Sequence, residues 1–179
     1  MLTGGGSVRM GADKAAADWL GIRAVDRVTA LAAAVGAAPI FCVGTRRYGL
    51  PQVADEPAGG GPVGGILAGA SALRAAGRRR ALILAVDAPT LRIEDLRPLL
   101  ACSGVGAVFD GLHFPMMVSL DALPDDARAD WPVGRLVERA GLARLPCDDE
   151  ARLRIRGANT PDERAVLLGR LRDEQDAPS

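Results

Sequence analysis

The stretch from Ala81 to Val86 reads Ala-Leu-Ile-Leu-Ala-Val and contains only apolar residues. A strand with one face in water alternates apolar and polar residues, whereas a strand buried on both faces is apolar throughout. The following residues, Asp87-Ala88-Pro89-Thr90, indicate a turn that ends the strand. The pattern is typical of a sheet with helices on both faces and predicts an α/β fold.

Helical and strand patterns alternate along the rest of the chain, and no internal repeat interrupts them. They fit one domain over 1–179 with three layers and a mostly parallel central sheet. We expect helices over 24–35, 66–76, 93–100, 133–140 and 164–174, and short strands over 39–43, 52–54, 106–110 and 143–146.

Composition excludes several classes of protein. The 22 basic and 22 acidic residues balance, which argues against nonspecific binding to nucleic acid or to an acidic membrane. Cys42, Cys102 and Cys147 form no C-x-x-C motif, so we expect buried free thiols rather than a zinc site or disulfides. Because no apolar run approaches the roughly 18 residues of a membrane span, we expect a cytoplasmic protein.

A glycine-rich loop occupies residues 3–14, close to the start of the sequence. Gly4, Gly5 and Gly6 have no Cβ, so the backbone there can turn sharply and bring its N–H groups close to an anion. Arg9 and Lys14 supply two cations to the same segment. Together these features suggest a site for a nucleoside triphosphate.

Two better-known glycine loops do not fit this segment. Gly6 and Gly11 have the spacing of a P-loop, but Ala12 and Asp13 stand where lysine and serine or threonine are required. A dinucleotide fingerprint needs a third glycine where this chain has Arg9. Glycine content alone would also fit a flexible N-terminal segment, so the loop needs support from other motifs.

That support comes from a family resemblance. The run LTGGGSVRMGADKA over 2–15 resembles the signature loop of the molybdenum cofactor guanylyltransferases, members of the MobA-like nucleotidyltransferases. Three more segments resemble family motifs in the family's order. They are Asp55 with GGGPVGGILAGASAL over 59–73, AVDAPTL over 85–91 and ANTPDE over 158–163.

The resemblance implies a three-layer, Rossmann-like nucleotidyltransferase fold and the transfer of GMP from GTP to molybdopterin, with Mg²⁺ as the cofactor and diphosphate released. It implies that Arg9 and Lys14 neutralise phosphate charge, and that Asp87 contacts the nucleotide and holds the metal. The other residues implied in nucleotide binding are Leu2, Thr3, Gly4, Gly5, Thr45 and Asp55. From its composition, the glycine cluster 56–65 is expected to lie outside any helix or strand.

Asp87 and Asn159 each have a plainer interpretation. A carboxylate at the carboxyl end of a central strand suits Mg²⁺, but Pro89 also fits a simple turn aspartate, and spacing alone favours neither. The resemblance favours the metal. It also lets Asn159 reach the metal or the acceptor, although Thr160 and Pro161 already explain that motif as a helix start.

Other functions remain open from the sequence. Gly4-Gly5 and the GGGPVGG segment favour guanylyl over cytidylyl transfer without deciding it, and another small-molecule nucleotidyltransferase of the same family is an alternative. A nucleotide-binding relative without transferase activity is a further alternative, against which the intact Lys14 and Asp87 argue. The family assignment also leaves room for molybdoenzymes or cofactor chaperones as partners.

Overall fold

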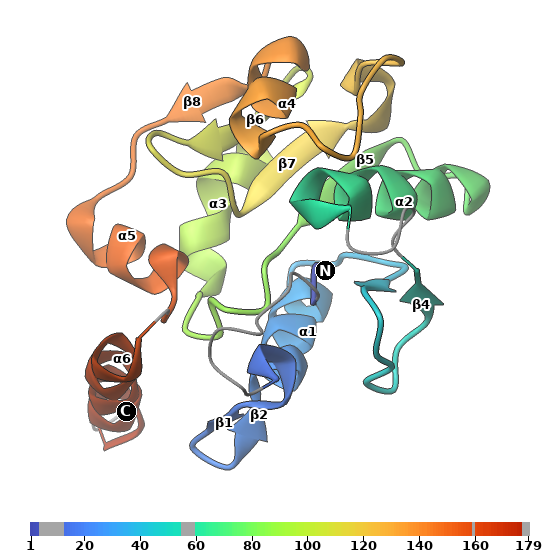
Figure 1. Cartoon of the computed structure of the whole chain (residues 1–179). Coiled ribbons are helices and arrows are strands. Elements are labelled where there is room, and N and C mark those ends of the chain that lie inside the picture. The colour runs from blue at the N-terminus through green and yellow to red at the C-terminus, as the bar shows by residue number, and fades with distance from the viewer. Residues whose placement is uncertain (4–12, 55–59, 159, 177–179) are drawn as a thin grey trace.

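The computed structural model describes residues 1–3, 13–54, 60–158 and 160–176 (Figure 1). The helices of the described part are the 3₁₀ turns η2 (Lys14–Ala16) and η3 (Leu120–Ala122) and the α-helices α1 (Ala24–Ala34), α2 (Gly61–Ala75), α3 (Ile93–Ala101), α4 (Val133–Arg139), α5 (Asp149–Arg156) and α6 (Pro161–Asp176). The strands are β1 (Asp18–Trp19), β2 (Ile22–Arg23), β3 (Cys42–Val43), β4 (Gln52–Val53), β5 (Arg80–Ile83), β6 (Gly106–Phe109), β7 (Met116–Ser119) and β8 (Ala143–Leu145).

The largest sheet has four strands in the order β5-β7-β6-β8. Strand β7 runs antiparallel to both β5 and β6, and only β6 and β8 are parallel. We expected a mostly parallel central sheet, whereas this four-stranded sheet is mixed. The physical reason is β7, which returns to the sheet between two strands of the opposite direction, where a helical crossover would be needed to keep all strands parallel.

Leu2 joins this sheet to a second, parallel pair of strands. Strand β3 pairs in parallel with β4, and Leu2 forms parallel bridges to Val43 on one side and to Ala85 on the other. The Leu2 N–H donates to Leu84 O at 2.8 Å, and the Val86 N–H donates to Leu2 O at 3.1 Å. The first residues of the chain thus act as a short strand between β3 and the extension of β5.

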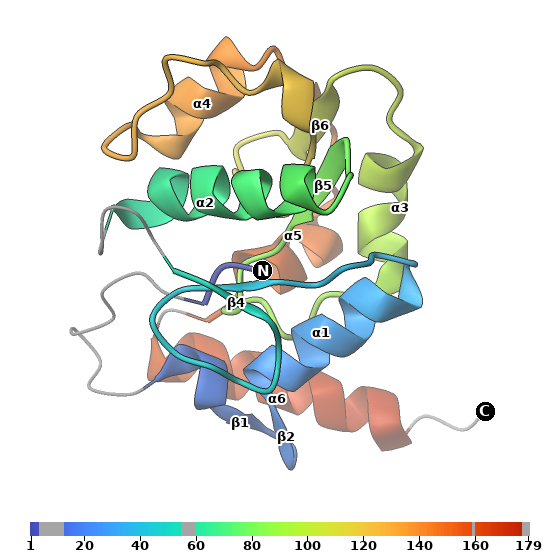
Figure 2. The same ribbon diagram turned by 90° about the vertical axis from the view of Figure 1, so that its right-hand side faces the viewer.

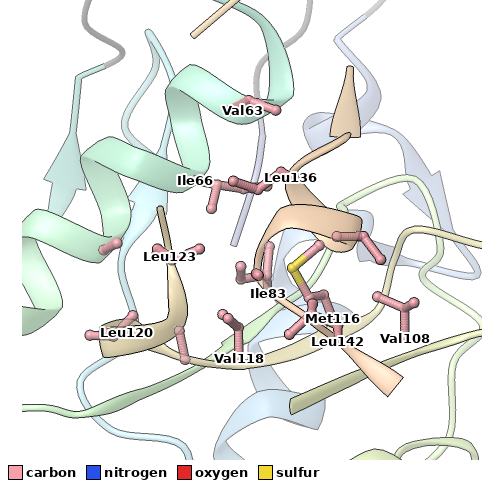
Figure 3. Packing of buried hydrophobic residues seen from close by; sticks show 14 of the residues in the cluster. Val63, Ile66, Ile83, Val108, Met116, Val118, Leu120, Leu123, Leu136 and Leu142 are labelled. Carbon is pink, nitrogen blue, oxygen red and sulfur yellow. The ribbon is translucent and has the colours of Figure 1, made fainter. Parts of the chain in front are cut away.

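Alternating side chains of the sheet pack against helices on both faces. Met116 and Val118 of β7 point to one face, where α2 and α4 supply the opposing side chains, whereas Met117 points to the other face, toward α1, α3 and α5. Figure 3 shows the first cluster, with Ile66 of α2 and Leu136 of α4 close to the strand residues. Viewed from the side, α2 and α4 lie above the N-terminus and α1 below it (Figure 2).

Helix α2 begins earlier than the glycine content predicts. It starts at Gly61 and includes Gly64 and Gly65, both buried, so the expectation that the cluster 56–65 lies outside any element is wrong for 61–65. Further along the helix, a Cβ at Gly69 would lie 3.2 Å from Val43 Cγ2, so the missing side chain there lets the helix approach β3. Tertiary packing here outweighs the intrinsic helix penalty of glycine, about 1 kcal/mol per residue.

Most other expected elements are confirmed within one or two residues. The helices at 24–35, 93–100 and 133–140 correspond to α1, α3 and α4, and the apolar run 81–86 forms β5 and its extension beside Leu2. The three cysteines are free, as expected, but only Cys42 is buried; Cys102 and Cys147 are partly exposed. In the described residues, no helix combines the length and apolar character that a membrane crossing requires.

An apolar cavity of about 60 Å³ lies near the amino ends of the central strands. Met1, Phe41 and Leu82 are among its lining residues, with the inner side of α2 as a further wall. It contains neither Lys14 nor Asp87, which belong to the opposite edge of the sheet. This cavity is therefore separate from Lys14 and Asp87.

Candidate active site

Lys14 and Asp87 meet at the carboxyl edge of the central strands. Lys14 Nζ lies 3.6 Å from Asp87 Oδ2, and the two side chains are 24% and 33% exposed. An ion pair this close to solvent stabilises a fold by only about 0–1 kcal/mol. Lys14 is the single lysine of the chain, whose other formally basic residues are all arginines. A compact ammonium on a flexible stem thus faces a carboxylate in a position that solutes can reach.

The sheet and a neighbouring loop fix Asp87 from two sides. Val86, directly before it, is tied to Leu2 through the backbone, as described above. On the other side the Ala158 N–H donates to the Asp87 carbonyl at 3.3 Å. Gly157 has φ +63° and passes so close that a Cβ there would overlap the Asp87 carbonyl oxygen. Only glycine permits this approach, which brings the ANTPDE segment beside the VDAP turn.

A capped 3₁₀ turn fixes Lys14. Asp13 is the N-cap residue of η2, and its carboxylate accepts a hydrogen bond from the Ala15 N–H at 3.0 Å. Ala15 is fully buried in a small core together with Trp19 and Val25. Since Lys14 stands between the cap and this buried anchor, its backbone is held from both directions.

Leu2 and Thr3 contribute to the same edge, but their backbone donors are already used. The Leu2 N–H bonds to Leu84 O, and the Thr3 N–H bonds to Val43 O at 2.9 Å. The Thr3 hydroxyl donates to Val43 O as well, at 3.0 Å. A contact of either residue with a nucleotide would therefore have to use other atoms than its backbone N–H.

The remaining predicted residues divide into one that is described and five that are not. Thr45 lies two residues beyond the end of β3 at Val43, and it is exposed. Its contact with a nucleotide stays a prediction. The residues that lie outside the described part of the structure are Gly4, Gly5, Arg9, Asp55 and Asn159. Their roles stay predictions too.

The start of α6 confirms the plainer interpretation of the ANTPDE motif. The Glu163 N–H donates to Thr160 Oγ1 at 3.2 Å, and the Thr160 N–H donates to Glu163 Oε2 at 3.0 Å. This reciprocal pair is a capping box, and Pro161 follows as the first helical residue. The capping box does not test the predicted contact of Asn159 with the metal or the acceptor, which stays a prediction.

Asp87 is suited to bind a Mg²⁺ ion that is also held by the phosphates of the substrate. Among the described residues, no three histidine, cysteine, aspartate or glutamate side chains gather closely enough to enclose a metal. Mg²⁺ is usually held by one or two carboxylates together with substrate phosphates and water. One partly exposed carboxylate beside a lysine therefore suits a metal that arrives with a triphosphate.

A cluster that sequence reasoning missed lies next to Lys14. The Tyr48 hydroxyl donates to Asp13, at 2.7 Å to Oδ2 and 2.9 Å to Oδ1, and an Arg46 N–H donates to Oδ2 at 3.1 Å. The sequence carried one signal for it, because the aspartate directly precedes the lysine in the loop pattern. The spacing of Asp13 and Tyr48 in the sequence does not predict this contact. It forms because the loop after β3 folds back onto η2.

Comparison with known proteins places this site in a family. Residues 1–125 match the model of the MobA-like NTP transferase domain. A protein of Opitutus terrae named probable molybdenum cofactor guanylyltransferase is 31% identical, over 92% of this chain and 91% of that protein. The molybdenum cofactor guanylyltransferase of Xanthomonas euvesicatoria pv. vesicatoria is also 31% identical, over 94% of this chain and 92% of that protein.

Solved structures share the fold. Molybdopterin-guanine dinucleotide biosynthesis protein A from Archaeoglobus fulgidus matches with a TM-score of 0.67 at 19% identity, over 96% of this chain and 97% of that one. A nucleotidyl transferase from a Methanothermobacter matches with a TM-score of 0.69 at 16% identity, over 90% and 87%.

The matching domain model and the two similar proteins define an enzyme that transfers nucleotidyl groups. This chain belongs to the MobA-like NTP transferase family.

Proposed function

We propose that this protein transfers GMP from GTP to molybdopterin and releases diphosphate, on a Rossmann-like nucleotidyltransferase scaffold. The observation that carries the proposal is the meeting of Lys14 and Asp87 at the carboxyl edge of the strands, where open α/β sheets bind ligands. Family membership and two guanylyltransferase relatives, each matching most of the chain, support the choice of reaction.

Lys14 supplies positive charge for the triphosphate. Its ammonium has no preferred acceptor plane, so it can leave Asp87 and follow phosphate oxygens as their charge redistributes. Nucleotidyl transfer needs mainly positioning and charge stabilisation from the protein, because the enzyme forms no covalent bond itself. The same role is proposed for Arg9, which lies outside the described residues.

Asp87 would hold Mg²⁺, with Asn159 proposed as a second contact. A metal there supplies Lewis-acid charge next to the phosphate oxygens. The carboxylate is positioned for this by the Leu2 bridge to the β5 extension and by the Ala158 hydrogen bond to its own carbonyl group. Lys14, which pairs with Asp87 in this structure, would contact the nucleotide phosphates beside that carboxylate.

The bond changes balance without any redox step. A phosphate oxygen of molybdopterin attacks the α-phosphorus of GTP and forms a new phosphorus–oxygen bond. The bond between the α-phosphorus and the bridging oxygen to the β-phosphate breaks, and diphosphate leaves with that oxygen. Negative charge is present on the bound triphosphate and on the leaving diphosphate, so a nearby ammonium stabilises the bound nucleotide as well as the transition state.

A nucleotide panel tests the proposal. Diphosphate release is measured with GTP, CTP, ATP and UTP, each with Mg²⁺ and with or without molybdopterin. We expect release with GTP that depends on molybdopterin and stops when the metal is chelated. Release with CTP alone would replace the guanylyl assignment with cytidylyl transfer. Thermal stabilisation by GTP without release under any condition would indicate a nucleotide-binding relative and contradict the proposal.

A further inference from the structure

The loop after β3 folds back onto the residue before Lys14. Tyr48 and Arg46 both bond the Asp13 carboxylate, although Thr45 of the same loop is exposed. Tyr48 also packs against the small core that contains Ala15. This loop therefore holds η2 through one ionic and hydrogen-bonded contact and through apolar packing.

Asp13 transmits that contact to Lys14. Its carboxylate caps the Ala15 N–H, and its carbonyl oxygen accepts the Ala16 N–H at 3.1 Å. These two bonds set the direction of the short turn that begins with Lys14. A 3₁₀ turn of three residues has little intrinsic stability, so its orientation depends on the groups that tie it down.

The protonation states of Asp13 and Tyr48 decide which group donates the hydrogen bond. Burial acts to raise the pKa of Asp13, but hydrogen bonds from Tyr48 and from the backbone of Ala15 and Ala16, with the charge of Arg46, lower it. Burial and the hydrogen bond to Asp13 raise the pKa of Tyr48 to about 12. At neutral pH the phenol donates to an ionised carboxylate, and hydrogen bonds to charged groups are about twice as strong as neutral ones.

We infer that Tyr48 is a positioning residue for nucleotidyl transfer, which acts through Asp13 to aim Lys14 at the triphosphate beside Asp87. The inference rests on the proposed function for its substrate. Arg46 reinforces the same contact, but its side chain is 69% exposed, so its contribution is the smaller one. The loop after β3 then contributes to the reaction by positioning Lys14, and this role does not depend on a contact between Thr45 and the nucleotide.

A double-mutant cycle tests the inference. KM for GTP and kcat are measured for the wild type, Tyr48→Phe, Lys14→Ala and the double variant. Tyr48→Phe keeps the ring and removes the donor, so we expect KM to rise roughly tenfold, the effect of one lost hydrogen bond to a charged group, with kcat changed less than about twofold. If Tyr48 acts through Lys14, the same change adds less than about twofold in the Lys14→Ala background.

Arg47→Ala is the matched control. Arg47 lies in the same loop and bonds Gln52 Oε1 at 3.1 Å rather than Asp13. We expect it to keep the wild-type KM. A Tyr48→Phe variant with wild-type KM, or one whose defect is equally large in both backgrounds, would overturn the inference and leave the proposed function standing. A wild-type protein that releases diphosphate from no nucleotide would remove the proposed function, and the inference with it.

A spectroscopic readout tests the contact without relying on activity. Tyr48 is the only tyrosine, so the ultraviolet change on phenol ionisation reports this residue alone. Asp13 and Cys42 act to raise its pKa and Arg46 acts to lower it. We expect ionisation near pH 12 in the folded wild type and at lower pH in Asp13→Asn. Ionisation at the same pH in both proteins would contradict the contact between Tyr48 and Asp13.

Discussion

Lys14 Nζ and Asp87 Oδ2 lie 3.6 Å apart, although one residue belongs to the 3₁₀ turn η2 and the other follows a strand near the middle of the chain. The sheet brings them together because Leu2 bridges to Ala85. Lys14 therefore lies beside the carboxylate that follows the β5 extension. If Lys14 contacts phosphate and Asp87 holds a metal, as proposed above, both groups act at one edge of the sheet.

Asp87→Asn should abolish metal-dependent turnover and preserve the fold. The amide keeps the size of the side chain but loses the charge that a magnesium ion requires. We expect diphosphate release to fall by at least about 10²-fold, with a thermal unfolding temperature close to that of the wild type. Asp110→Asn is the matched control, because Asp110 also follows a strand of the sheet, β6, and is exposed. Unchanged turnover in Asp87→Asn would remove it from the metal site.

Lys14→Ala should weaken nucleotide use far more than it weakens folding. The partly exposed ion pair contributes little stability, whereas loss of one electrostatic partner costs about 10²–10³ in rate. We expect kcat/KM for GTP to fall by that amount and Lys14→Arg to recover only part of it, because a guanidinium places its charge differently. A calorimetric GTP affinity equal to that of the wild type would place Lys14 outside the site.

Gly157→Ala should distort the backbone at Asp87. Gly157 has φ +63° and ψ −164°, a conformation open almost only to glycine, and a Cβ there would overlap the Asp87 carbonyl oxygen. We expect a loss of about 2–4 kcal/mol in the free energy of unfolding. Gly141→Ala is the control, since Gly141 has φ +65° but nothing within 4 Å of the new Cβ. Its cost should be only about 1–2 kcal/mol. Equal losses in denaturant unfolding would contradict the close approach.

Arg154→Met should destabilise the protein strongly by leaving Asp95 unpaired. Arg154 bonds both carboxylate oxygens of Asp95, at 2.7 and 2.9 Å, and the Asp95 side chain is only 2% exposed. Breaking a buried pair from one side costs about 3–5 kcal/mol. The exposed pair of Arg128 and Asp130 provides the comparison, with an expected cost for Arg128→Met below about 1 kcal/mol. Chemical denaturation that shows similar losses for both variants would contradict the buried role of the pair.

The stability of the protein should fall at high pH through Tyr48. Its pKa is about 12 in the folded protein, above the ordinary value of 10.0, so the folded state holds the proton more tightly. This contribution is complete below about pH 10 and is lost as the pH rises toward 12. The difference in unfolding free energy between wild type and Tyr48→Phe should therefore shrink across that window. A difference that stays constant would mean that the phenol ionises alike in both states.

Asp13 should show the opposite dependence at low pH. Its pKa lies below the ordinary value, so the folded state favours the carboxylate. The stabilisation is complete above the ordinary value of 3.8 and is lost as the pH falls through the lowered pKa. Urea unfolding of wild type and Asp13→Asn between pH 7 and acid should converge. A constant difference in unfolding free energy between the two proteins over the whole pH range would contradict an ionised Asp13 as the N-cap of η2.

The sequence predicted those parts of the fold that local pattern determines. The apolar run 81–86 required burial on both faces, and Thr160-Pro161 with Glu163 marked a helix start; both are confirmed. Helix α5 was not predicted, although Asp148 caps it and acidic and basic residues occupy its first and last turns. The start of α2 was misjudged because Gly64 and Gly65 are buried inside the fold there, and local propensity does not contain this tertiary packing.

Only those site residues that belong to a sequence motif could be predicted. Lys14 and Asp87 stood out as a cation after a glycine loop and a carboxylate after a strand, and the structure brings them into contact. The hydrogen bond between Tyr48 and Asp13 could not be foreseen, because it depends on how the loop after β3 returns to η2. The antiparallel β7 was missed for a similar reason, since strand direction follows from topology rather than from residue pattern.

The most direct measurement uses the single lysine. Reductive methylation with ¹³C-labelled formaldehyde labels amines and keeps their charge, so Lys14 gives the only side-chain signal in a carbon–proton spectrum. We predict that this signal shifts in a saturable way when GTP and Mg²⁺ are added, and that Asp87→Asn alters it before any nucleotide is present. A Lys14 signal that stays in place at GTP concentrations supporting diphosphate release would contradict a shared site for Lys14, Asp87 and the triphosphate.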